Sequence, residues 1–102
     1  MASGARIFPA DLEAFCTEAM RRCGLRAEDA RITGQVLTTT DTWGVHTHGT
    51  RQLRQLMKNV RQGRLHPAAE PEVIAQGPAW AIVDGHYAMP MRSSWEGMNI
   101  LR

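Results

Sequence analysis

Two histidines stand close together within residues 41–64 and are the side chains best suited to proton chemistry. The unperturbed pKa of imidazole lies near neutrality, so a histidine can give and take a proton at working pH. His48 lies between Thr47 and Gly49, directly before a helical pattern that begins at Thr50. Gly49 has no side chain and leaves the backbone open to the close approach of a ligand. The pattern favours proton transfer at His48, with a surface loop of two solvated histidines as the simpler alternative.

A basic helical run follows the histidines. Residues 42–69 contain five Lys or Arg and no Asp or Glu. Backbone N–H groups at a helix start are unpaired and carry partial positive charge. Arg51 and Arg54 follow within the first turn or so of that helix. We therefore expect an anionic ligand, a carboxylate or a phosphate, to bind near Gly49, Arg51 and Arg54.

The same run permits a second function class, a small non-catalytic helical module that binds protein or nucleic acid through residues 50–64. A recognition helix of the helix-turn-helix type needs a tight preceding turn and exposed base-reading side chains. Here the connection, residues 43–49, is long and carries the histidines, and the basic side chains are spread around the helix. These features disfavour a nucleic-acid partner.

A metal site is the third possibility for the histidines. His46 and His48 would share one face of an extended segment, where a metal could bind between them. Zinc normally needs three or four ligands, however. Cys16 and Cys23 belong to the apolar stripe of a separate helix, about two turns apart and too far apart to bond to each other. We expect them to be reduced core thiols, and we assign no metal site.

Length and composition predict one small domain with no membrane span. The chain has 102 residues, of which 43% are hydrophobic and 22% are charged, which are ordinary globular values. The net charge of +2 is too small to name a partner. No apolar run approaches about 18 residues, and the N-terminal residues lack the apolar core of a signal peptide. A cytoplasmic location is the default expectation.

Hydrophobic periodicity predicts an α+β fold with three N-terminal helices, a short two-strand segment and a C-terminal helix. The expected helices cover residues 9–23, 27–42, 50–62 and 90–102, and the expected strands cover residues 72–76 and 79–84. The last helix presents Met91, Trp95 and Met98 along one face. An apolar face of this kind needs a partner surface, and exposed patches favour association.

Three motifs, WGVHTHGT, GRLHPAAEP and GPAWAIVDG, occur in this order along the chain. With these motifs the sequence resembles the malate/L-lactate dehydrogenase family, whose members include ureidoglycolate and sulfolactate dehydrogenases. The resemblance extends from about Leu12 to the C-terminus, and the Gly–x–x–(Ser/Thr)–His–Gly core at residues 44–49 is its most specific part. It implies an NAD(P)-dependent oxidoreductase of 2-hydroxy, 2-keto or imino acids with a non-Rossmann fold.

The resemblance also implies roles for individual residues. The family's catalytic histidine, which assists proton transfer at the substrate, falls on His48, and Thr47 takes the place of the usual serine that orients it. Many members have an arginine four residues after this histidine and a tyrosine eight residues after it. This sequence has Gln52 and Leu56 at those positions, with Arg51 beside the first. Arg51 and Arg54 are therefore the expected substrate-binding cations.

The remaining implications concern the cofactor and the assembly. The resemblance implies NAD or NADP, but it identifies no cofactor-binding residue in this chain. Family members are much longer, and the rest of their sequence carries most of the nicotinamide-binding surface. We therefore expect residues 1–102 to form a single N-terminal segment that is inactive alone, to associate as a homodimer, and to act on a small 2-keto or 2-hydroxy acid in the complete enzyme.

Overall fold

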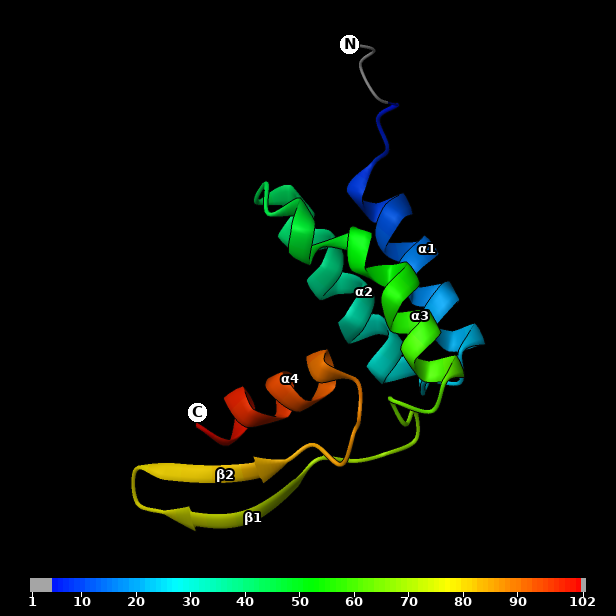
Figure 1. Ribbon diagram of the computed structural model, residues 1–102. Helices are drawn as coiled ribbons and strands as arrows, with labels where there is room; N and C mark the ends of the chain where they lie inside the picture. The colour runs from blue at the N-terminus through cyan, green and yellow to red at the C-terminus, as the bar shows by residue number, and fades with distance from the viewer. Residues whose placement is uncertain (1–4, 102) are drawn as a thin grey trace.

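The computed structural model describes residues 5–101 and confirms the α+β fold (Figure 1). The elements in chain order are α1 (Pro9–Arg22), α2 (Ala27–Thr42), α3 (Leu53–Arg61), β1 (Glu72–Gly77), β2 (Trp80–Asp84) and α4 (Pro90–Ile100). Two short 3₁₀ turns, His46–His48 and Thr50–Gln52, precede α3. The expected third helix therefore begins as a 3₁₀ turn and becomes α-helical only at Leu53. Within residues 5–101, no helix is long and apolar enough to cross a membrane.

Helices α1, α2 and α3 pack side by side around the core (Figure 1). The connection between α1 and α2 is short because Gly24 adopts φ +102°, a left-handed conformation that glycine tolerates best. The N–H of Leu25 donates to the carbonyl of Met20 and the N–H of Gly24 to that of Arg21, which together end α1. Leu25 thereby enters the core, whose buried residues are Met20, Leu25, Ala30, Leu37, Leu56 and Met89.

Gly34 lies inside α2, although glycine is a poor helix former. The helix nevertheless runs without interruption from Ala27 to Thr42. A Cβ atom at Gly34 would lie 2.4 Å from Oγ1 of Thr17 and 3.1 Å from the carbonyl oxygen of Glu13, both on α1. Gly34 therefore allows the two helices to approach closely, and this packing outweighs its poor helix propensity.

The two strands form an antiparallel hairpin, as the sequence predicts. Glu72 pairs with Asp84 and Gly77 with Trp80, and the register shifts between Val73 and Ala75. Figure 1 shows the hairpin away from α1 and α3, with α4 beside it. No further strand joins this sheet among residues 5–101, so neither edge is hydrogen-bonded to another strand there.

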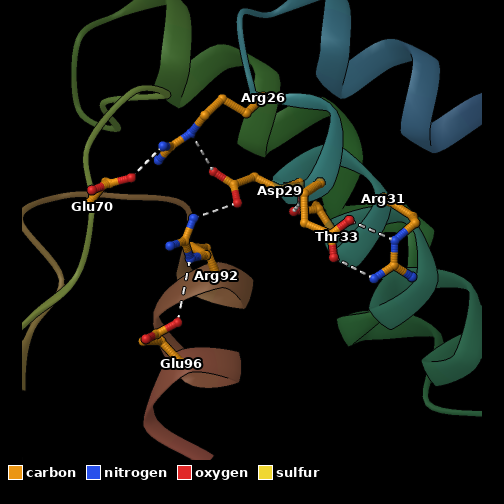
Figure 2. Close-up of polar contacts among 8 residues, drawn as sticks. Arg26, Asp29, Arg31, Thr33, Glu70, Arg92 and Glu96 are labelled. Carbon is orange, nitrogen blue, oxygen red and sulfur yellow. Dashed lines mark hydrogen bonds and ion pairs between the residues drawn. The ribbon is translucent and has the colours of Figure 1, made fainter. Parts of the chain in front are cut away.

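A buried carboxylate fixes α4 against α2 (Figure 2). Asp29 of α2 is 3% exposed. Its Oδ1 accepts a hydrogen bond from Nη1 of Arg92 on α4 at 2.7 Å, and its Oδ2 lies 3.4 Å from Nε of Arg26. Arg26 also pairs with Glu70 in the segment before β1. A carboxylate removed from water needs such partners, so this network sets where α4 docks.

An apolar groove of about 520 Å³ separates α4 from the middle of α2. Its walls include Val36 of α2 and Met91, Trp95 and Met98 of α4. Trp95 and Met98 remain 41% and 64% exposed. The face of α4 that the sequence marks as unpartnered is thus open to solvent.

Candidate functional site

The histidine loop, residues 43–49, connects α2 to the turn before α3. Residues 43–48 are all exposed, and Gly49 is buried. Oγ1 of Thr47 lies 2.9 Å from Nδ1 of His48, so the two side chains share a hydrogen bond. This is the contact expected between the candidate catalytic histidine and its neighbour. Their roles in catalysis stay predictions.

Asp41, in the last turn of α2, holds the far end of this loop and was missed by the sequence-based assignment of site residues. Its Oδ2 accepts hydrogen bonds from the backbone N–H of Thr50, at 3.1 Å, and from the hydroxyl of Thr50. Its Oδ1 lies 3.3 Å from Nδ1 of His46. An acidic residue at a helix C-terminus faces the negative end of the helix dipole. That unfavourable placement is the signal in the sequence that Asp41 has a partner elsewhere.

The contacts of Asp41 also set its charge. Burial alone would raise the pKa of its carboxyl group. The hydroxyl and backbone N–H of Thr50, together with His46, outweigh burial and hold the pKa of Asp41 below its usual range. Asp41 is therefore a carboxylate at neutral pH.

This carboxylate changes the expected anion site. The sequence suggests free N–H groups at Thr50 for a carboxylate or phosphate ligand. In the structure the N–H of Thr50 donates to Asp41, so a protein anion already occupies that donor. The turn at Thr50 also does not fit the pyrophosphate of a dinucleotide, because Asp41 would repel it.

Gln52 supports the loop from the other side. Its side-chain Nε2 donates a hydrogen bond to the carbonyl oxygen of Thr47 at 2.6 Å. Gln52 stands where many family members have arginine, and here its amide group is used within the protein. Leu56, at the position of the family's tyrosine, is 7% exposed and belongs to the core.

The two candidate substrate-binding arginines have different surroundings. Arg51 is exposed in the 3₁₀ turn Thr50–Gln52. Arg54 borders a groove of about 490 Å³ between α1 and α3, together with Phe15 and Met57. His48 is not among the residues that line this groove. The structure therefore does not bring Arg54 and His48 together there, and the substrate roles of both arginines stay predictions.

Neither Cys16 nor Cys23 forms a disulfide. Both are free, with Cys16 buried and Cys23 partly buried. Burial, and secondly the charge of Asp41, raise the pKa of Cys16, which keeps the thiol protonated. Among the described residues, no three His, Cys, Asp or Glu side chains lie together as a metal site would require.

Comparison with known proteins defines the class to which this fold and loop belong. Residues 7–101 match the malate/L-lactate dehydrogenase family. The chain is therefore a member of that family. It is 32% identical over 84 residues to the delta(1)-pyrroline-2-carboxylate reductase of Pseudomonas fluorescens, an alignment covering 82% of this chain and 25% of the relative.

Two further relatives are similar in sequence and in structure. The malate dehydrogenase of Pyrococcus horikoshii is 26% identical over 89 residues, covering 87% of this chain and 25% of that protein. Its solved structure superposes with a TM-score of 0.89 at 25% identity, over 93% of this chain and 27% of that one. The sulfolactate dehydrogenase of Methanocaldococcus jannaschii shares the fold, with a TM-score of 0.86 at 23% identity over 90% of this chain and 27% of that one. The chain spans about a quarter of the length of the curated relatives that it matches.

Proposed function

We propose that this chain is the substrate-side segment of an NAD(P)-dependent oxidoreductase that acts on 2-keto, 2-hydroxy or cyclic imino acids. Family membership supports the reaction class, and the relatives' names include malate, sulfolactate and pyrroline carboxylate enzymes. The observation that carries the proposal is the hydrogen bond between Thr47 and His48 in the family's most specific motif.

In this proposal His48 exchanges the proton that the reaction needs. NADH or NADPH would supply the hydride, as in other nicotinamide-dependent enzymes. Reduction of a 2-keto acid places negative charge on the C2 oxygen, and reduction of a cyclic imine needs a proton at nitrogen. A nearby imidazolium supplies that proton. In the imidazolium both ring nitrogens carry a proton, so Nδ1–H donates to the hydroxyl of Thr47 and Nε2–H is left to face a substrate.

The substrate carboxylate needs a cationic anchor near His48. Gln52 is already bound to the loop backbone, whereas Arg51 beside it is exposed. We propose Arg51 as the anchor, with the backbone at Gly49 lining the approach, because a guanidinium can bind a carboxylate through two parallel hydrogen bonds. Arg54, on the wall of the groove between α1 and α3, is the weaker candidate.

The proposal predicts a difference between the chain alone and the chain in an enzyme context. The 102-residue chain, mixed with NADH or NADPH and a panel of 2-keto acids, should leave the absorbance of the reduced nicotinamide unchanged, because the described residues offer no assigned dinucleotide site. A graft in which residues 7–101 replace the matching segment of the P. fluorescens reductase should reduce delta(1)-pyrroline-2-carboxylate. Turnover by the chain alone, or a folded graft without turnover, would contradict the proposal.

We also propose that the chain associates with itself through its open apolar surfaces. Trp95 and Met98 line the groove between α2 and α4, and neither edge of the hairpin pairs with another strand in the described part of the chain. Sedimentation velocity at tens of micromolar, about the range in which weak interfaces become populated, should show a dimer or a larger species. Replacement of Met98, which is 64% exposed, by glutamate should shift that population toward monomer. A compact monomer of the unmodified chain at these concentrations would count against this proposal.

A further inference from the structure

The histidine loop has no apolar anchor of its own. Trp43 and Val45, its two large apolar residues, are 76% and 46% exposed. Residues 46–48 are exposed as well. The position of the loop must therefore come from polar contacts, among them the bond from Gln52 to Thr47, since burial of apolar side chains cannot fix it.

Asp41 supplies the contacts at the α3 end. Its side chain is 16% exposed, and both of its oxygens are used. Oδ2 binds the N–H and hydroxyl of Thr50, directly after the loop, and Oδ1 faces Nδ1 of His46 within it. Hydrogen bonds to an ionised acceptor are stronger than those between neutral groups. One carboxylate thus ties two points of the loop to the end of α2.

Gly49 shows how closely the carboxylate packs against the loop backbone. A Cβ atom at this position would lie 1.9 Å from Oδ1 of Asp41 and 2.5 Å from its Cγ. The φ of Gly49 is −94°, so the glycine is not needed for a left-handed conformation. It is needed because the Asp41 side chain fills the space that any other residue would require.

The helix itself gains nothing from Asp41. A negative charge in the last turn faces the negative end of the helix dipole, and aspartate is a poor helix former. The contacts beyond the helix are what compensate for this placement. We propose that Asp41 is the positioning residue that fixes the histidine loop, and with it the imidazole of His48. Asp41 does not touch His48, so its effect passes through Thr50, Gly49 and His46.

The importance of this position for catalysis rests on the proposed function, but the positioning itself can be measured without turnover. The experiment compares the 102-residue chain with its Asp41→Ala variant, and Asp11→Asn, an exposed carboxylate on α1, is the matched control. Amide hydrogen exchange by NMR reports the N–H of Thr50. Long-range proton–nitrogen spectra at about pH 8, where an unperturbed imidazole is neutral, report the ring of His48.

In Asp41→Ala, exchange at Thr50 should accelerate by about tenfold or more, the worth of a hydrogen bond to a charged group. The ring nitrogen shifts of His48 should move toward those of a free histidine, while those of His66, which packs on Tyr87, stay unchanged. Exchange in the core of α1, at Cys16 and Met20, should stay within about twofold. Asp11→Asn should change none of these signals.

The proposal is overturned if either the exchange at Thr50 or the ring signals of His48 match those of the unmodified chain. If Asp41→Ala unfolds the whole chain, Asp41→Asn provides the comparison, because it keeps the side-chain shape and one acceptor oxygen. The proposal is supported if the acceleration of exchange, relative to the unmodified chain, is larger at Thr50 than at Cys16 in that variant. Equal acceleration at both positions overturns it. If the exchange and ring signals change as expected but the graft is inactive, the positioning role of Asp41 stands and only the proposed function is rejected.

Discussion

Replacement of Arg92 by methionine is expected to lower the free energy of unfolding by about 3 kcal/mol, the usual cost of removing one partner from a buried ion pair. Arg92 contributes the 2.7 Å hydrogen bond to Asp29, whose side chain is 4% exposed (Figure 2). Methionine keeps an unbranched apolar side chain at this position but leaves the Asp29 carboxylate with Arg26 alone, at 3.4 Å. Urea denaturation followed by circular dichroism measures the difference.

Two further variants test whether the stability cost of Arg92→Met comes from the buried charge of Asp29 or simply from the loss of an arginine. Arg31→Met removes an arginine from the same helix as Asp29, but the Arg31–Glu28 pair is exposed, with side chains 49% and 65% accessible. Because water solvates both side chains, the expected cost of this change is small compared with that of Arg92→Met. The double change Asp29→Asn with Arg92→Met should recover part of the lost stability, because it removes a buried charge that Arg26 alone compensates only in part. An Arg92→Met variant as stable as Arg31→Met would show that the network does not hold α4.

The features predicted from the sequence are those set by local spacing. The apolar stripe of α1, with Leu12, Cys16 and Met20 at helical intervals, predicts its helix to within a residue. Two β-rich runs split by a short loop predict the hairpin. Thr47 and His48 are neighbours in the chain, so their hydrogen bond needed no knowledge of the fold.

The features that the sequence missed depend on residues that meet only after folding. Asp29 and Arg92 are 63 positions apart, and nothing in their local patterns pairs them. Gly34 is a poor helix former, and the reason for a glycine there, the close packing of α1, becomes visible only in the fold. Asp41 and Thr50 meet because the histidine loop folds back, and their contact replaces the free helix start that the local pattern suggests.

His48→Ala in the grafted enzyme is expected to lower kcat by about a hundredfold or more, the usual contribution of a positioned general acid. The reason is the lost proton at the C2 oxygen or imine nitrogen, which water would supply less effectively. The fold should be unaffected, because the imidazole of His48 is exposed and contributes little to the core. The circular dichroism spectrum and unfolding midpoint of the variant should therefore match those of the parent graft.

The most direct test of the account is the kcat of the graft for delta(1)-pyrroline-2-carboxylate, measured for His48→Ala beside His66→Ala. His66 is also an exposed histidine, and it lies outside the loop, against Tyr87. The account predicts a loss of about a hundredfold or more for His48→Ala and a kcat close to that of the parent graft for His66→Ala. Normal turnover in a folded His48→Ala graft would contradict the assignment of His48 as the proton-transfer residue.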